Sequence, residues 1–380
     1  MKRIVFFTTS SDYKGGAIMC LIEAFKYVNR NDIEPFFIVS KRGSTEKVLE
    51  EMHIPYKYIR CSDWLQPEWI IKSNKFKFKR PLQILSNILA EIRIYFFLKK
   101  GKFDGYHLNS IYSGVGVRAA HALKIPVFWH LREFVDENPW TSTFINERYS
   151  YSLIEKSYKL LAVSNSVKAY YQTKMPRANF EVVYDGVEFS TLNNPRKEIC
   201  FHSPLRLSMV GGVVEVKGHE DAIRASAILK NKNIPFIITI YGRNRDGGYM
   251  QRLNSLINEL GVSDVIQFAG YRNDMKHVWN ETDICLVCSK SESFGRITVE
   301  AMCQNIPVIG ADNSGTHELI GPDTVGLQYR TGNPEDLSNK IVEIMHKNYN
   351  QKELDRNQNY VQQFSSKSSA KRLVEVLTKI

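Results

Sequence analysis

Short apolar runs alternate with longer amphipathic stretches along almost the whole chain. The runs have the length of buried strands, and stretches such as residues 17–28 and 113–123 have the period of helices. The predicted strands are residues 4–8, 35–39, 103–108, 126–129, 160–163 and 180–183 in a first series, then 205–210, 236–240, 265–268, 284–288 and 307–309 in a second. Strands that alternate with helices form parallel sheets with helices on both faces. We therefore predict an α/β protein with two Rossmann-like parallel-sheet domains.

The length of the chain agrees with two domains, because 380 residues exceed what one hydrophobic core usually holds. The polar, proline-containing stretch 192–198 separates the two series of strands. We place the first domain at residues 1–193 and the second at residues 194–365. A C-terminal helix at about residues 366–380 is expected to return to the first domain.

Two carboxylates, Glu292 and Glu300, follow the apolar run 284–288. The pattern predicts a strand, then a loop, then a helix that begins at Arg296. One carboxylate would then lie at the carboxyl end of a strand, where open α/β sheets bind ligands, and the other about a turn and a half into the helix. The alternative is that both side chains are simply exposed, as most glutamates are.

Backbone N–H groups at the start of this helix offer a seat for phosphate. They belong to Phe294, Gly295 and Arg296. Hydroxyl-binding carboxylates on either side of a phosphate-binding loop suit a ligand with hydroxyls at both ends and a diphosphate in its middle. A nucleotide sugar is such a ligand.

The spacing of Glu292 and Glu300 resembles the E-x7-E motif of the retaining glycosyltransferases of family 4. That family has the GT-B fold, in which two Rossmann-like domains face each other across a cleft. The resemblance implies that Glu292 contacts the donor sugar and that Glu300 holds the ribose hydroxyls of the donor nucleotide.

A lysine after the first strand of the second domain is a further candidate for phosphate binding. Residues 208–219 are similar to the family segment G-R-x-x-x-x-K-G, with Lys217 at the family lysine, where its ammonium would neutralise a diphosphate. Gly212 stands where the family has arginine, so either another residue, such as Arg243 or Arg206, supplies the missing charge, or stabilisation of the leaving group is weaker. The alternative is a surface lysine at the start of a helix.

Further segments extend the resemblance from about residue 4 to residue 337. Gly15 and Gly16 follow the first strand, as the family's glycine pair does, and the paired glycines would let the backbone approach a ligand closely. His130 ends a strand and matches the family histidine near the transferred sugar. Gly315 and Thr316 match a loop whose amides face the diphosphate. A flexible turn and a structural histidine are the respective alternatives for the glycine pair and for His130.

Metal and cofactor chemistry have no clear signal in the sequence. The chain has no Asp-x-Asp motif, and Cys285 and Cys288 lie within a predicted strand, where an odd separation sends them to opposite faces. We expect no metal and no cofactor, and a UDP-sugar is the favoured donor. A G-x-G-x-x-A pattern at residues 114–119, with Glu133 after the next strand, leaves an NAD-binding enzyme as one alternative. A GT-B epimerase or hydrolase is the other.

Positive charge is concentrated in the first half of the chain. Residues 1–190 contain 28 Lys or Arg and 19 Asp or Glu, which gives a net +9 of the total +11. Residues 70–102 hold nine basic residues, one acid and many large apolar residues. Such a segment is typical of a surface that docks on an anionic membrane, and a solvated basic face is the alternative. No nucleic-acid motif accompanies it.

The resemblance to family 4 implies a retaining glycosyltransferase, and the missing Asp-x-Asp motif makes metal-independent chemistry the expectation. The enzyme would move a sugar from a nucleotide diphosphate to a hydroxyl of a lipid-linked glycan in surface polysaccharide biosynthesis. The expected catalytic residues are Glu292, His130 and Lys217. The first apolar stretch, residues 4–7, is too short for a secretory signal, so a cytoplasmic location, or one on the inner face of the cytoplasmic membrane, is expected.

Overall fold

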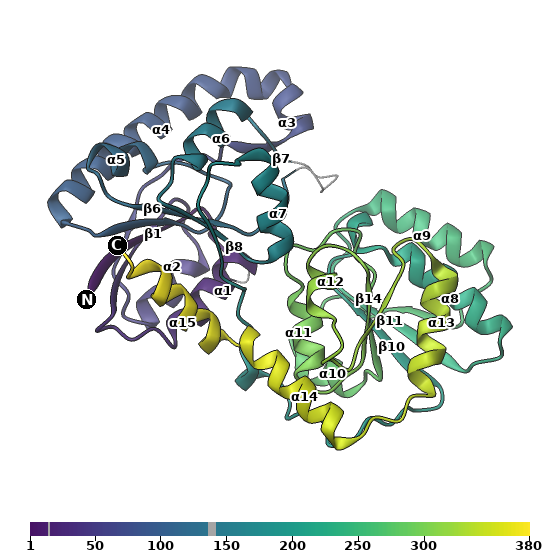
Figure 1. Ribbon diagram of the computed structural model, residues 1–380. Coiled ribbons are helices and arrows are strands. Elements are labelled where there is room, and N and C mark those ends of the chain that lie inside the picture. Colours follow the sequence, from purple (N-terminus) through teal and green to yellow (C-terminus); the bar gives the residue numbers. More distant parts are fainter. Residues whose placement is uncertain (14–15, 136–141) are drawn as a thin grey trace. The chain divides into compact units, whose positions relative to one another are not determined.

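The computed structural model describes residues 1–13, 16–135 and 142–380. The chain divides into two compact units (Figure 1). Unit 1 contains Met1–Gly186 together with Ser366–Ile380, and unit 2 contains Val187–Ser365. Each unit has its own parallel sheet with helices packed against it, so the prediction of two Rossmann-like α/β sheets is confirmed.

Unit 1 contains a seven-stranded parallel sheet in the order β3-β2-β1-β5-β6-β8-β9. Its strands are β1 (Lys2–Thr8), β2 (Ile33–Val39), β3 (Tyr56–Tyr58), β5 (Gly105–Leu108), β6 (Val127–Leu131), β8 (Lys159–Ala162) and β9 (Phe180–Val182). A separate antiparallel pair joins β4 (Leu65–Pro67) to β7 (Ser142–Phe144). The central strands are buried along their length, which explains why the sequence shows them as continuous apolar runs.

The helices of unit 1 come from both ends of the chain. They are α1 (Gly16–Phe25), α2 (Ser44–Glu51), α3 (Glu68–Lys72), α4 (Asn74–Gly101), α5 (Val117–Ala122), α6 (Glu147–Glu155), α7 (Asn165–Lys174) and α15 (Ser366–Leu377). Helix α15 packs against α1, and its residues Ala370, Leu373, Val376 and Leu377 join the same apolar core as β1 and β2. The last residues of the chain therefore complete the first unit.

Unit 2 contains a six-stranded parallel sheet in the order β12-β11-β10-β13-β14-β15. Its strands are β10 (Leu205–Val210), β11 (Phe236–Tyr241), β12 (Ile266–Phe268), β13 (Ile284–Val287), β14 (Val308–Ala311) and β15 (Leu327–Tyr329). Its helices are α8 (His219–Asn231), α9 (Gly247–Glu259), α10 (Met275–Asn280), α11 (Arg296–Met302), α12 (Ser314–Leu319), α13 (Pro334–Met345) and α14 (Gln351–Val361), with short 3-10 turns η1 (Phe189–Thr191), η2 (Glu215–Lys217) and η3 (Gln362–Phe364).

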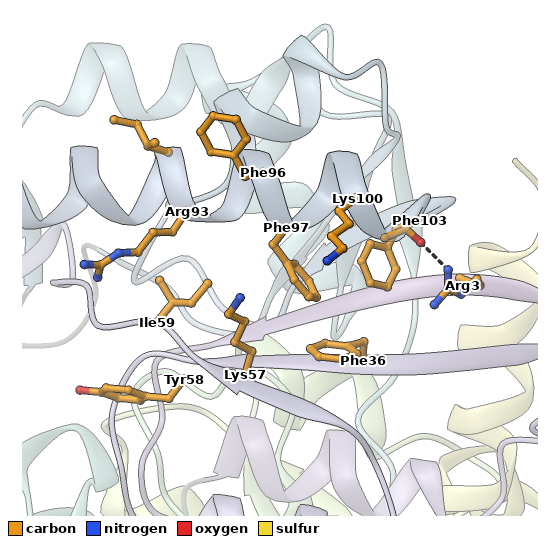
Figure 2. Close-up of a pocket in the computed structure, with 12 residues that line it drawn as sticks. Arg3, Phe36, Lys57, Tyr58, Ile59, Arg93, Phe96, Phe97, Lys100 and Phe103 are labelled. Carbon is orange, nitrogen blue, oxygen red and sulfur yellow. Dashed lines mark hydrogen bonds between the residues drawn. The ribbon is translucent and has the colours of Figure 1, made fainter.

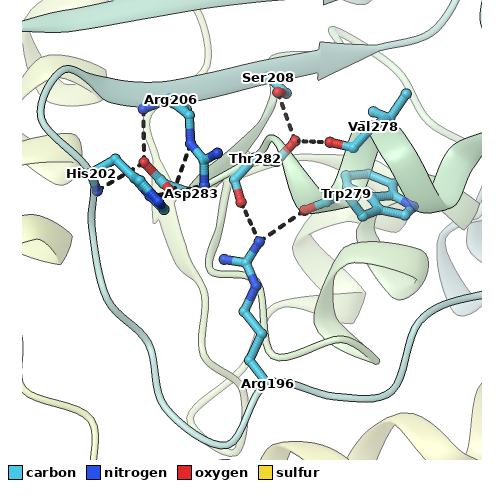
Figure 3. Close-up of polar contacts among 8 residues, drawn as sticks. All are labelled: Arg196, His202, Arg206, Ser208, Val278, Trp279, Thr282 and Asp283. Atoms are coloured by element: carbon cyan, nitrogen blue, oxygen red, sulfur yellow. Dashed lines mark hydrogen bonds and ion pairs between the residues drawn. The ribbon is translucent and has the colours of Figure 1, made fainter.

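The stretch that the sequence suggested as the domain boundary is anchored in unit 2. Arg196 donates to the backbone carbonyls of Trp279 and Thr282 at 2.8 and 2.7 Å (Figure 3). Upstream of it, the amide of Val187 donates to the carbonyl of Phe364. The units therefore divide between residues 186 and 187, whereas the sequence placed the boundary after residue 193. The stretch belongs to unit 2 because its polar side chains, such as that of Arg196, bond to the backbone of unit 2.

Candidate active site

A lysine and a glutamate 75 residues apart in the chain meet at the carboxyl ends of β10 and β13. Lys217 ends η2, and Glu292 lies in the loop between β13 and α11. The Lys217 Nζ lies 2.6 Å from the Glu292 Oε2, and the Ser289 hydroxyl donates to the same oxygen at 3.1 Å. The side chains of Lys217 and Glu292 are 30% and 19% exposed. A charged pair at this edge of a parallel sheet is accessible to a ligand.

Glycine beside Lys217 is required by close packing. Gly218 has a φ of +64°, and a Cβ built there would lie 1.9 Å from the carbonyl oxygen of Cys288. Only a residue without a side chain allows the loop to approach the end of β13 so closely. A Cβ on Gly211 would lie 3.6 Å from the Cε of Lys217, so the lysine stem lies over this glycine. These glycines bring Lys217 to the end of β13, where Glu292 follows.

Arg206, one of the two residues expected to replace the missing family arginine, is committed elsewhere. It lies near the amino end of β10, and its Nη2 lies 2.9 Å from the Oδ1 of the fully buried Asp283 (Figure 3). Lys217 follows the carboxyl end of the same strand. Arg206 is therefore at the wrong edge of the sheet, and this part of the prediction is wrong.

Arg243 and Arg245 follow β11, the strand beside β10, and they belong to the correct edge. The Arg243 guanidinium lies over the ring of Tyr271, 4.4 Å from its centroid. Arg245 lies closer to the Gly212 position, because a Cβ built there would be 3.4 Å from the Arg245 Cδ. Arg245 was not among the residues named from the sequence. The sequence feature that could have indicated Arg245 is its position two residues after Arg243 in the same loop.

Glu300 lies in the second turn of α11 and is largely buried. Its side chain is 12% exposed, and its Oε1 lies 3.9 Å from the Nε of Arg296 one turn earlier. The helix begins after Gly295, whose φ of +101° favours glycine. Arg296 therefore accompanies Glu300 on one face of the helix, as expected for residues four apart.

The loops before α11 and α12 are joined to each other. The amide of Gly315 donates to the carbonyl of Glu292 at 2.7 Å, and a Cβ on Gly315 would lie 2.6 Å from the carbonyl oxygen of Phe294. The family resemblance implied that the Gly315 amide faces a diphosphate, whereas in the structure this amide bonds to the Glu292 loop. Thr316 and Phe294 are buried, with 0% and 2% of their surfaces exposed.

In unit 1, His130 belongs to a buried polar cluster at the end of β6. It is 2% exposed, its Nδ1 lies 3.1 Å from the Arg132 Nη2, and its ring packs edge-on against His107. Arg132 also forms an ion pair with Asp185 and donates to the Asn109 side chain. The Asp185 carboxylate is thus the charged partner of Arg132.

The protonation of His130 follows from these contacts. Burial, and then the charge of Arg132, hold the pKa of His130 well below its usual value, so the ring is neutral. A guanidinium only donates hydrogen bonds, so Nδ1 accepts and the proton resides on Nε2. Among the described residues Nε2 has no hydrogen-bond partner, although the Val183 backbone lies near enough to influence the pKa. His130 thus carries one N–H group, on the buried Nε2.

Glu133 is a second ionisable group of this cluster and is partly buried, and the sequence indicated only a nucleotide-binding role for it. Burial raises its pKa to about 7, and the Arg132 charge and the Ser110 hydrogen bond oppose that rise. The Ser110 hydroxyl contacts both carboxylate oxygens, at 3.2 and 3.3 Å. A carboxyl group that titrates near neutrality can accept or donate a proton.

The glycine pair after β1 is described in part. Gly15 lies outside the described residues. Gly16 is the first residue of α1, it is exposed, and a Cβ built on it would meet nothing within 4 Å. Packing within the described residues therefore does not require glycine at position 16.

The alternative of a dinucleotide site at residues 114–119 is excluded by the protein's own contacts. Gly116 precedes α5, and the Glu91 carboxylate of α4 accepts from the amides of Gly116 and Ala119 at 2.9 and 3.3 Å. A dinucleotide phosphate would need these donors. The ring of Trp64 also packs on Gly114, where a Cβ would lie 2.3 Å from the ring.

Two family models match consecutive parts of the chain. "Glycosyltransferase Family 4" matches residues 15–191, and "Glycosyl transferases group 1" matches residues 193–363. Together they extend over both units.

Similar proteins carry related descriptions. The chain is 29% identical over 175 residues to the putative colanic acid biosynthesis glycosyltransferase WcaL of Escherichia coli, a match to 44% of this chain and 42% of that protein. It is 27% identical over 177 residues to the amylovoran biosynthesis glycosyltransferase AmsK of Erwinia amylovora, with the same two shares. The chain thus matches less than half the length of each relative. The structure of Anabaena Alr3699/HepE in complex with UDP and glucose superposes with a TM-score of 0.75 and 20% identity, over 100% of both chains.

Proposed function

Because this chain belongs to the group 1 glycosyltransferases and has the GT-B fold, we propose that it transfers a sugar from a nucleotide diphosphate to a hydroxyl of a glycan. The observation that carries the proposal is the Lys217–Glu292 pair at the carboxyl ends of β10 and β13. The Lys217 ammonium can bind phosphate, and the Glu292 carboxylate, 2.6 Å from it, can bind sugar hydroxyls. The pair therefore suits the point at which the sugar of such a donor is bonded to its diphosphate.

The reaction breaks the bond between the anomeric carbon of the sugar and the terminal phosphate oxygen of the donor. The acceptor hydroxyl forms the new bond on the same face of the sugar, and a donor phosphate oxygen takes its proton, as the family resemblance implies. Negative charge accumulates on the leaving diphosphate, and Lys217 stabilises it without a metal ion. Arg245 beside Gly212, with Arg243 next to it, provides the second charge.

The other predicted residues take the remaining parts of the donor. Glu292 orients the sugar hydroxyls, and Glu300 in α11 accepts from the ribose. The family resemblance implies that His130 lies near the transferred sugar, and its imidazole is neutral. The backbone at residues 294–296 contacts the diphosphate.

We favour a UDP-sugar as donor and a lipid-linked glycan as acceptor. A structural neighbour of this chain holds UDP and glucose, and relatives are described as enzymes of colanic acid and amylovoran biosynthesis. These similarities support a donor with uridine and an acceptor that belongs to a surface polysaccharide.

A screen of UDP-, GDP- and ADP-sugars by calorimetry tests the donor, with the corresponding sugar monophosphates as controls. Binding of one nucleotide sugar, lost in Glu300→Ala, is expected. The bound donor is then incubated alone and with lipid-linked glycan. A transferase consumes donor rapidly only with acceptor, whereas rapid hydrolysis or epimerisation of donor alone would overturn the proposal. NMR of the new linkage shows whether the anomeric configuration is retained.

A further inference from the structure

Helix α4 carries a row of apolar side chains that face away from unit 1. Positions four and three residues apart in alternation lie on one side of a helix. The row, here called the outer stripe, consists of Phe78, Leu82, Leu85, Leu89, Ile92 and Phe96, whose exposed fractions run from 44% to 84%. On an ordinary surface helix this side would be polar.

The opposite side of α4 is packed on the protein. Ala90, Ile94 and Leu98 are buried, and Glu91 caps α5 from the same region of the helix. By length and composition α4 could cross a membrane. Its packed side and the engaged Glu91 carboxylate tie it instead to unit 1, so the outer stripe is held as an external surface.

A pocket of about 880 Å³ adjoins the carboxyl half of α4, between this helix and the edge strands of the sheet. Lys57 extends from β3 toward α4, and Lys100 extends from α4 toward the sheet (Figure 2). Arg93, seven residues before Lys100, lies on the same side of the helix. Arg3 also lines the pocket but is paired with Glu34. The described residues that line the pocket include no carboxylate.

The floor of this pocket is aromatic. Phe36, Phe97 and Phe103 line it, and the Lys57 Nζ lies 5.1 Å from the centroid of Phe97. Ile92 and Phe96 belong both to the outer stripe and to the pocket lining. The apolar surface therefore continues into a cationic pocket, which is the arrangement that a phosphate attached to an acyl chain requires.

We propose that unit 1 docks on a bilayer of anionic phospholipid, with the outer stripe of α4 in the headgroup–acyl boundary and one phosphate headgroup in the pocket. Charge favours a bilayer over a second copy of this chain, because residues 70–102 hold nine basic residues and one acid and would repel an identical surface. Arg3 near the start of β1 places one end of the pocket near the amino ends of the strands, whereas His130 lies near the carboxyl end of β6.

The first test uses the wild-type chain and needs no variant. Co-sedimentation is measured with vesicles of phosphatidylcholine alone and with vesicles of equal parts phosphatidylcholine and phosphatidylglycerol. Stronger binding to the anionic vesicles, weakened by salt, is expected. Equal binding to both vesicle types, or none to either, would overturn the proposal.

The second test removes the pocket charges through Lys57→Gln, Arg93→Gln and Lys100→Gln together. Each Lys or Arg near an anionic surface contributes about fivefold in binding, so the partition coefficient on anionic vesicles should fall about 100-fold. The control variant replaces three exposed lysines outside the pocket, through Lys47→Gln, Lys352→Gln and Lys371→Gln. Equal loss in both variants would mean that overall charge, and not the pocket, drives binding, which contradicts the proposal.

The third test replaces three leucines of the outer stripe, Leu82, Leu85 and Leu89, by glutamine. These side chains are exposed, so the melting temperature should stay unchanged while anionic vesicle binding falls about tenfold or more. Light scattering without lipid checks for dimers. A wild-type dimer that this variant converts to monomer, with vesicle binding intact, would show that a second copy covers the stripe and would refute the proposal.

Discussion

Replacement of Lys217 by methionine tests the proposed electrostatic stabilisation of the leaving group. Methionine keeps much of the side-chain volume and removes the charge. The lysine Nζ lies 2.6 Å from the Glu292 carboxylate and is 30% exposed, so it acts in a partly screened environment. A unit charge about 4 Å away, at an effective dielectric constant of about 20, interacts with an ammonium by about 4 kcal/mol.

The expected loss follows from how much charge develops in the transition state. If between half and all of a unit charge appears on the diphosphate, the barrier rises by about 2–4 kcal/mol, and the rate falls about 30- to 1000-fold. The same change should leave the melting temperature nearly unaltered. Glu292 retains the Ser289 hydrogen bond and some contact with solvent, so its carboxylate is not left without partners.

The assay measures initial rates at saturating donor, with and without EDTA. Lys230→Met is the matched control, because Lys230 is also in unit 2 and pairs with a carboxylate, Asp264, at 2.7 Å. We expect the control and the EDTA-treated wild type to keep their activity. Abolition by EDTA with recovery on addition of manganese, or a Lys217→Met rate within twofold of the control, would refute the reasoning.

Three further predictions concern other parts of the candidate site. Glu300→Ala should weaken calorimetric binding of the nucleoside diphosphate product, whereas Glu292→Ala should leave that affinity intact and reduce turnover; equal losses of affinity contradict the two roles. Burial raises the pKa of Glu133 in the folded protein to about 7, above the value of about 4.3 expected in the unfolded chain. The folded protein therefore prefers the neutral carboxyl group, and the stability that this preference adds is fully present below pH about 4.3 and is lost as the pH rises through 7. Urea unfolding should therefore show that Glu133→Gln becomes more stable relative to wild type as the pH rises between these values. A difference in unfolding free energy that does not change with pH would show that the pKa is ordinary. Gly16→Ala should fold normally, since a Cβ there meets nothing within 4 Å, and should lower kcat/KM if the loop approaches a ligand; unchanged kinetics would remove Gly16 from the site.

The sequence by itself determined the fold class and most of the strands. Strands that are buried on both faces have continuous apolar sequences, so β1, β10 and β13 could be predicted from the sequence. The short strands β3 and β15 were not predicted, although the equally short β9 and β12 were. The order of strands in each sheet likewise depends on contacts between distant segments.

The candidate site was predicted where it depends on local spacing and missed where it depends on packing. Lys217 and Glu292 could be named from their motifs, but their ion pair exists because β10 and β13 are neighbours in the sheet. Arg206 was a reasonable choice in the sequence, and only the fold shows it at the opposite end of β10.

The same distinction holds for the polar groups of unit 1 and for α4. Burial decides that His130 is neutral and that Glu133 has a raised pKa, and burial is a property of the folded chain. The sequence of α4 is apolar on several sides, and tertiary packing alone selects which side is covered. The residues set what each segment can do, and the contacts between segments decide which groups are brought together and which are left to face solvent.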